Sequence, residues 1–221
     1  RTNIDLRFPF VAWTLASTPQ GNPKFPEAVL TDSIDYNFNR AKLAWYNIEP
    51  NLQDKNSSNN PLRRNVAELS DPRVRQVFTN ELFPQRTTNI TDVQTATLDL
   101  AYYPKEKGPY NFETRSAQIG ADGKFKTPTA KWGGIMRAID QTDFETGNIE
   151  FIEFWMQDPF ILPQYANSNG GKLYFNLGNI SEDVLKDGKR FYENGLNTPN
   201  APSPVDTTVW GKVPRNPIQV T

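Results

Sequence analysis

The segment Asn148–Met156 (NIEFIEFWM) is apolar on both faces of an extended chain. Successive side chains of a strand point to opposite faces of its sheet. The odd-numbered positions carry Ile149, Phe151 and Trp155, and the even-numbered positions carry Ile152, Phe154 and Met156. Only a strand that is covered on both sides buries such a pattern. The segment therefore predicts a central strand, with these side chains largely buried: Ile149, Phe151, Ile152, Phe154 and Trp155.

Other segments also have the pattern of strands. Lys172–Ile180 alternates, with Leu173, Phe175 and Leu177 on one face, and we expect it to pair with Ile149–Met156. The 18 prolines and the 12% aromatic content fit strands that are separated by proline-containing loops. The remaining predicted strands are Val11–Ala16, Tyr36–Ile48, Thr91–Tyr103, Trp132–Ile139 and Asp206–Val213.

Two short helices are predicted. The first covers residues 71–82, where Ser70 or Asp71 can cap the helix and Pro72 suits its first turn. The second covers residues 181–187, with Ser181 as its cap and a glycine after its last turn. These elements together predict a mainly β fold, an antiparallel β-sandwich for which a jelly roll is one arrangement.

We expect residues 1–221 to form a single β-rich domain that is cut from a larger chain. The sequence begins on Arg1 without Met and ends on a strand-like Ile218–Thr221. The polar segment Lys55–Pro61 is expected to be an exposed loop inserted in this domain, because apolar strands flank it on both sides.

The composition excludes several classes of function. With no His and no Cys, the chain cannot use Ser–His–Asp or Cys–His catalysis, and it cannot form disulfides or Cys-type metal sites. The 24 basic and 25 acidic residues give a net charge of −1, so we expect no nucleic-acid partner. No enzymatic activity and no cofactor are expected.

Carboxylates offer few candidate sites. Glu150 and Glu153 would point to opposite faces of a strand and could not act as a catalytic pair. Calcium prefers oxygen ligands, and the acidic turns leave open whether the chain binds this metal. The turn residues concerned are Asp122, Asp140, Asp143 and Glu145.

Aromatic residues suggest a different surface. Trp132, Tyr102, Tyr103, Tyr110 and Phe112 could form a platform that stacks on sugar rings, or they could pack the core or a protein interface. The loop Tyr103–Phe112 is the strongest candidate for protein contact, since Gly108-Pro109 restricts its conformations and its aromatic rings offer rigid contact area. The alternative is a loop folded back on its own domain. The candidate interaction residues are Tyr103, Lys105, Glu106, Lys107, Tyr110, Asn111 and Phe112.

Six ordered phrases extend over most of the chain. They are Arg40–Tyr46 (RAKLAWY), Leu98–Pro104 (LDLAYYP), Lys107–Asn111 (KGPYN), Trp132–Arg137 (WGGIMR), Ile152–Phe160 (IEFWMQDPF) and Gly171–Asp183 (GKLYFNLGNISED). In these phrases the chain resembles the SprA/Sov family of Bacteroidota, giant outer-membrane proteins of gliding motility and type IX secretion. The phrases contain no catalytic motif, so they point to a family and not to a site.

The resemblance implies a soluble fragment that acts as a non-catalytic structural or interaction domain of a protein-secretion translocon. It further implies association with the outer membrane, at the cell surface or the periplasmic face, with membrane contact through the parent protein only. The implied partners are other secretion-system proteins, secreted cargo and the rest of its own chain. The alternative function is a carbohydrate-binding β-sandwich module at the cell surface, which would need an exposed aromatic platform. An enzyme with two facing carboxylates is a third hypothesis, which no carboxylate pair in the sequence favours.

Overall fold

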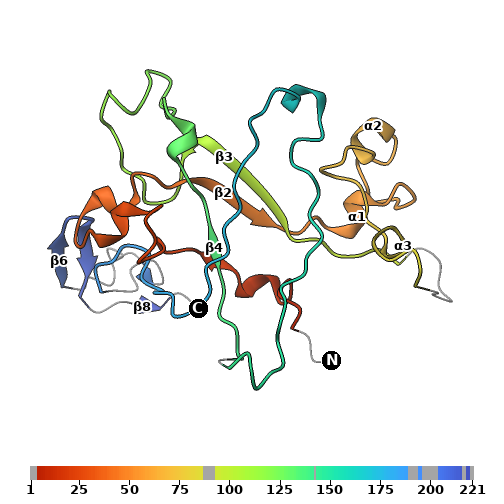
Figure 1. Cartoon of the computed structure of the whole chain (residues 1–221). Coiled ribbons are helices and arrows are strands. Elements are labelled where there is room, and N and C mark those ends of the chain that lie inside the picture. Colours follow the sequence, from red (N-terminus) through yellow and green to blue (C-terminus); the bar gives the residue numbers. More distant parts are fainter. Residues whose placement is uncertain are drawn as a thin grey trace. The chain divides into compact units, whose positions relative to one another are not determined.

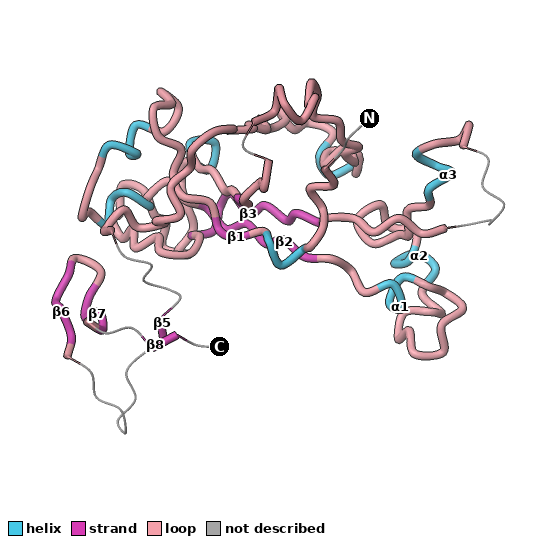
Figure 2. The backbone as a smooth tube through the Cα atoms, turned by 90° about the horizontal axis from the view of Figure 1, so that it is seen from below, coloured by secondary structure: helices cyan, strands magenta, loops and turns pink. Residues whose placement is uncertain are grey.

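The computed structural model describes residues 4–86, 93–141, 143–188, 194–195, 204–215 and 218–219. Most of this chain is loop, and the regular elements are short (Figure 2). The strands are β1 (Thr14–Leu15), β2 (Ala41–Tyr46), β3 (Asp99–Lys107), β4 (Ile135–Met136), β5 (Asn194–Gly195), β6 (Val205–Thr208), β7 (Gly211–Pro214) and β8 (Ile218–Gln219). The α-helices are α1 (Pro50–Gln53), α2 (Val66–Leu69) and α3 (Thr79–Leu82). Single 3-10 turns occur at Phe10–Ala12, Pro26–Val29, Ile34–Asn37, Pro128–Ala130 and Pro163–Tyr165.

The strands pair two by two. The two-stranded sheets in the described chain are β1–β4, β2–β3, β5–β8 and β6–β7, and β2 and β3 are the longest pair (Figure 1). Where β2 meets β3, the Gly108 N–H donates to Arg40 O at 3.1 Å and Lys42 contacts Glu106, so the two strands run antiparallel. The prediction of antiparallel strands with only a few short helices is therefore confirmed, although most of the strands are shorter than predicted.

The chain divides into two compact units, each made of three separate segments. Unit 1 comprises residues 1–12, 45–100 and 138–174, and unit 2 comprises residues 13–44, 101–137 and 175–221. Because these segments alternate along the sequence, no single point in the chain separates one unit from the other. The single domain remains a prediction.

Unit 2 contains an apolar core. Among the described residues of unit 2, the buried hydrophobic ones are Phe25, Ala28, Tyr36, Phe38, Ala41, Phe125 and Leu185. Trp132 meets Phe25 edge to face, with ring centroids 5.4 Å apart. The chain is tightly packed at Gly133, since a Cβ there would lie 2.9 Å from the Cβ of Leu43.

Arg40 lies within this core with 0% of its surface exposed. Its Nε donates to Asn37 Oδ1 at 2.9 Å and its Nη1 donates to Ala16 O at 2.6 Å, while its guanidinium carbon lies 4.6 Å from the Trp132 ring centroid. A buried charge is tolerated where hydrogen bonds replace its hydration. Arg40 therefore connects three segments of unit 2 that are distant in sequence.

Unit 1 is closed by polar contacts. Gln53 Nε2 donates to Val74 O at 2.7 Å, and Gln94 Nε2 donates to Gln53 Oε1 at 2.6 Å. Asn60 Nδ2 donates to Asp54 O at 2.9 Å. Among the residues of unit 1 that the structure describes, the fully buried ones are Gln53 and Asn60, and no large hydrophobic side chain is among them. The two units therefore differ in what holds them together.

The helix predicted at residues 71–82 is wrong except for its last four residues, which form α3. In a continuous helix the Val74 carbonyl would accept the N–H of Phe78. Instead, the Val74 carbonyl accepts a hydrogen bond from Gln53 Nε2. Phe78 has an extended backbone and forms an antiparallel β-bridge with Gln94. A tertiary contact thus overrides the helical pattern.

The second predicted helix, at residues 181–187, is also wrong, because bends replace it. The Asp183 carboxylate accepts the N–H of Leu185 at 3.1 Å, that of Lys186 at 2.7 Å and that of Gly188 at 2.6 Å. Aspartate side chains compete in this way with the backbone bonds of a helix. The segment therefore closes around one carboxylate.

Two predicted strands are absent. Neither residues 148–156 nor residues 172–180 form a strand, and their large apolar side chains are mostly exposed. Phe151 is 74% exposed and Trp155 is 68% exposed, so the predicted burial is wrong, and only Ile149 is half-buried. No other part of the described chain forms a sheet with either segment, so no strand covers their faces. The remaining exposed members of the predicted core are Ile152 and Phe154.

The other long strands are shorter than predicted or shifted. Only residues 41–46 of the predicted strand Tyr36–Ile48 form β2, because a 3-10 turn precedes it. The strand predicted at Thr91–Tyr103 starts outside the described residues, and β3 continues past its predicted end to Lys107. Pro104 fits within β3 because each strand of a two-stranded sheet is an edge.

Candidate functional site

The predicted interaction loop Tyr103–Phe112 is a loop only in its second half. Tyr103 to Lys107 belong to β3, so the prediction is wrong there. The turn that follows begins at Gly108, where a Cβ would lie 2.7 Å from the carbonyl carbon of Ala41 and closer still to its oxygen. Tyr110 in the turn has φ +65°, in the left-handed region. The backbone is thus held close to β2.

Asn111 fastens this turn to unit 2. Its Nδ2 donates to Arg40 O at 2.7 Å and to Phe38 O at 3.1 Å, and its Oδ1 accepts the N–H of Glu113 at 3.0 Å. The side chain is 6% exposed. Asn111 therefore serves its own domain, as the fold-back alternative requires, and is not available to a partner.

Three of the candidate residues keep exposed surface beside β2. Lys42 Nζ lies 2.8 Å from Glu106 Oε2 and 4.7 Å from the Tyr103 ring centroid. The hydrogen bond from Lys42 lowers the pKa of Glu106, and the same contact raises the pKa of Lys42. Lys105 is exposed next to this group. This exposed pair is a weak contributor to stability and leaves both charges accessible.

The remaining candidates are partly engaged within unit 2. Lys107 Nζ donates to Glu113 O at 3.1 Å. Tyr110 is half-buried, and burial raises the pKa of its phenol to about 12. Phe112 is exposed, and its ring centroid lies 6.0 Å from that of Trp210. The turn thus offers Phe112 to solvent while its neighbours face the domain.

The proposed aromatic platform is not assembled as one surface. Both Arg40 and Phe25 contact the Trp132 ring. Tyr102 donates its hydroxyl hydrogen to Lys131 O at 2.6 Å, and as the neighbour of Tyr103 in a strand it points to the opposite face. The rings that could have stacked on a sugar are therefore directed differently.

Two of the carboxylates considered as calcium ligands, Asp143 and Asp122, accept hydrogen bonds within turns. Asp143 Oδ1 accepts the N–H of Thr146 at 3.0 Å, and its Oδ2 accepts the Thr146 hydroxyl at 2.5 Å, contacts that lower the pKa of Asp143. Asp122 Oδ1 accepts the N–H of Lys124 at 3.1 Å. Asp140 and Glu145 are exposed. Within the described ranges no three acidic residues gather into a group suited to a metal ion.

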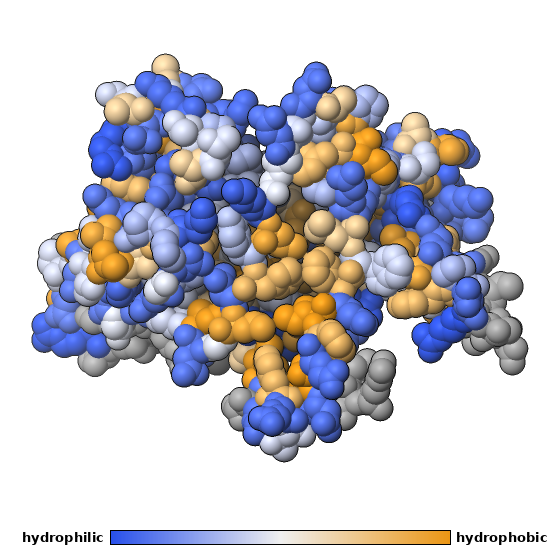
Figure 3. All heavy atoms as spheres, viewed as in Figure 1, coloured by the Kyte–Doolittle hydropathy of each residue, from blue (hydrophilic) through white to orange (hydrophobic). Residues whose placement is uncertain are grey.

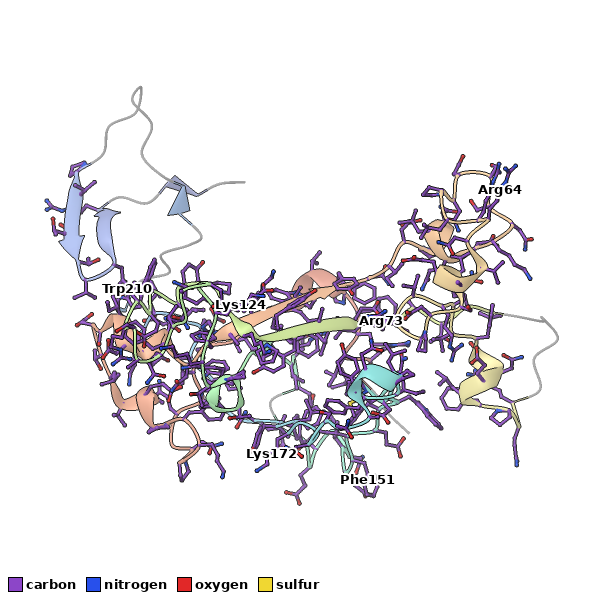
Figure 4. The ribbon with its side chains drawn as sticks, turned by 90° about the horizontal axis from the view of Figure 1, so that it is seen from above. Arg64, Arg73, Lys124, Phe151, Lys172 and Trp210 are labelled. Carbon is purple, nitrogen blue, oxygen red and sulfur yellow. The ribbon has the colours of Figure 1, made fainter. Side chains whose placement is uncertain are left out.

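A second group of exposed apolar side chains lies outside the predicted loop. Residues 149–158 of unit 1, which we call the 149–158 segment, expose Phe151, Trp155 and Met156 by 74%, 68% and 61%. Figure 4 shows Phe151 at the outer margin of its ribbon, pointing away from it. The Trp155 ring meets that of Phe83, with 6.0 Å between the ring centroids. Figure 3 shows hydrophobic side chains at several places on the viewed face of the molecule.

The sequence signal for this surface was the same one that predicted a buried strand. An apolar pattern on both faces indicates that both faces lose water, but it does not say which chain covers them. The pattern therefore identifies these residues, but its prediction that they are buried in the core is wrong.

Comparison with models of protein families and with curated proteins gave no match for this chain. Among the described residues, no helix combines the length and the hydropathy required to cross a lipid bilayer.

Proposed function

We propose that the chain is a non-catalytic interaction part of a larger outer-membrane machine for type IX protein secretion and gliding motility. Its partners would be other secretion-system proteins, secreted cargo and the rest of its own chain. The family assignment rests on the sequence phrases that resemble the SprA/Sov family. The interaction role rests on one observation: within the described part of unit 1, large apolar side chains are exposed and none is fully buried.

The size of the exposed surface supports this role. The chain exposes 16166 Å². Two separate compact proteins, each of half its 25.1 kDa mass, would together expose about 12000 Å². The difference, on the order of 4000 Å², is larger than the surface that a standard protein–protein interface buries, about 1600 Å². The chain therefore has enough surplus surface for one or more stable interfaces.

The β-sandwich belongs to the same proposal. Residues 148–156 and 172–180 have the residue pattern of strands but lack strand partners in the described chain. Strands contributed by a partner would let both segments join a sheet and would cover their apolar faces. The sandwich would then be completed on assembly.

Substitutions in the parent protein test the interaction role. Phe151→Glu and Trp155→Glu place charges on the exposed segment, and Val66→Glu is the matched control, because Val66 on α2 is also 74% exposed. The readouts are recovery of secretion-system partners on purification and the amount of secreted cargo. We expect the first two variants to lose both, the control to retain both, and the isolated 221-residue chain to keep its unfolding temperature in all three.

Two results would count against the proposal. One is normal partner recovery and secretion in Phe151→Glu and Trp155→Glu. The other is a lowered unfolding temperature in the isolated chain, since it would mean that the two rings stabilise the domain itself.

A further inference from the structure

The 149–158 segment is an open stretch of backbone between two turns. The Ile149 N–H donates to Phe144 O at 2.8 Å before it, and the Ile161 N–H donates to Asp158 O at 3.4 Å after it. Between these turns the chain forms neither helix nor strand and is drawn as loop in Figure 1. Backbone of this kind can pair with a strand from another chain without disrupting a sheet of its own.

The side chains of the segment suit such pairing. In an extended backbone, Phe151 and Trp155 fall on one face and Ile152 and Met156 on the other, and all four are exposed. Strands that are apolar on both faces are normally central in a sheet. A docked strand would therefore cover part of the apolar surface that the described chain leaves exposed.

The charge of the region selects the partner. From residue 138 to residue 171 the chain has no Lys or Arg. Its six carboxylates are Asp140, Asp143, Glu145, Glu150, Glu153 and Asp158. Neither Glu150 nor Glu153 forms an ion pair with any described residue. Lys42 and Arg73, in contrast, are already paired with acidic residues. Opposite charges on neighbouring strands attract, and like charges directly opposite repel.

We propose that the 149–158 segment binds an extended, basic strand of a partner protein by β-strand pairing. Backbone hydrogen bonds would hold the strand, apolar side chains would cover both faces of the segment, and Lys or Arg residues would lie opposite Glu150 and Glu153. This inference rests on the proposed function, because it names the partner of the same exposed segment.

A synthetic probe tests the inference on the complete 221-residue chain. The probe is a fluorescent ten-residue peptide of Lys, Val and Thr with Lys on both faces, and its counterpart carries Glu in place of each Lys. Fluorescence anisotropy should show binding of the basic peptide only, weakening as salt rises. Glu150→Gln and Glu153→Gln should each weaken binding by about two- to fivefold. Glu68→Gln, an exposed acid on α2, is the control that changes the net charge equally.

A proline substitution separates strand pairing from simple charge attraction. Ile152→Pro removes a backbone N–H from the exposed segment and should weaken peptide binding by about tenfold, while circular dichroism and the unfolding temperature stay unchanged. Equal binding of the two peptides, no binding of either, or unchanged binding by Ile152→Pro would each overturn the inference. So would self-association of the chain that Ile152→Pro abolishes, since the occupant would then be a second copy.

Failure here and failure of the proposed function give different results. If the basic peptide does not bind but Phe151→Glu still loses its partners in the parent protein, the segment is an interface for a partner of other chemistry. If partner recovery also survives Phe151→Glu, the interaction role of the segment itself is wrong.

Discussion

Asn111 offers the sharpest test of how unit 2 is held together. Its amide fastens the Gly108 turn to the backbone of Phe38 and Arg40 and orients the chain at Glu113. Replacement by alanine removes one acceptor and two donated hydrogen bonds at a side chain that is almost completely buried. The backbone groups left behind would lose their partners in a place that water reaches poorly.

The magnitude follows from the number of bonds. A typical internal hydrogen bond contributes about 1 kcal/mol net, and a buried group left unsatisfied costs about 1–3 kcal/mol. Part of this loss is recovered if water enters the space of the amide. We therefore expect Asn111→Ala to lower the free energy of unfolding by about 2–4 kcal/mol, measured by urea denaturation followed by tryptophan fluorescence. Asn51→Ala, which removes an exposed amide bonded to Glu49, should change it by less than about 0.5 kcal/mol.

Asn111→Asp adds a pH test of the same contacts. The new carboxylate would face two carbonyl oxygens in a buried position, so the folded state would raise its pKa above the usual value of about 4. A raised folded-state pKa favours the protonated form. The variant should therefore be closest to the parent in stability below about pH 4 and should lose stability as pH rises. A loss below about 1 kcal/mol in Asn111→Ala, or a pH-independent Asn111→Asp, would refute the assigned role of the amide.

Three further outcomes follow from the structure. Phe151→Ala should lower the free energy of unfolding of the isolated chain by less than about 1 kcal/mol, instead of the roughly 3–5 kcal/mol of a buried ring, and a larger loss in urea denaturation would show that the ring is covered. Gly108→Ala should destabilise by about 1–3 kcal/mol, because its methyl group meets the Ala41 carbonyl; an unchanged denaturation midpoint would mean that the turn can move away. Tyr110 should ionise near pH 12 in the folded chain, so its contribution to stability is complete below about pH 10 and is lost as pH rises towards 12. The difference between ultraviolet titrations of the parent chain and of Tyr110→Phe isolates the Tyr110 phenol, and an ordinary pKa for this phenol would contradict the prediction.

Local patterns predicted the elements that neighbouring segments support. Residues 41–46 and 99–103 lie within the predicted strands Tyr36–Ile48 and Thr91–Tyr103, and both form strands. Gly133, in the segment predicted as the strand Trp132–Ile139, packs closely against the side chains of Leu43 and Tyr102. In each case the sequence signal and the tertiary contact favour the same conformation.

The incorrect predictions share a different cause, since a distant or competing group decided the conformation. Gln53 donates a hydrogen bond to the Val74 carbonyl, which a helix at residues 71–82 would need for its own backbone. The sequence near residue 74 contains no signal that predicts this contact. Asp183 can cap a helix or collect turn N–H groups with the same carboxylate, and the structure has the second arrangement. Residue propensities alone do not distinguish a capped helix from a turn at Asp183.

The 149–158 segment shows what hydrophobic periodicity measures. A strand pattern that is apolar on both faces predicts that both faces are shielded from water, but it does not specify whether the same chain or another chain supplies the covering atoms. In unit 2 one group of apolar residues is covered by its own chain, because Phe25, Tyr36, Phe125 and Leu185 come from separate segments that converge. Unit 1 has comparable residues but closes through amide side chains such as Gln53. The same pattern therefore predicts a core in one unit and, by the proposal made above, an interface in the other.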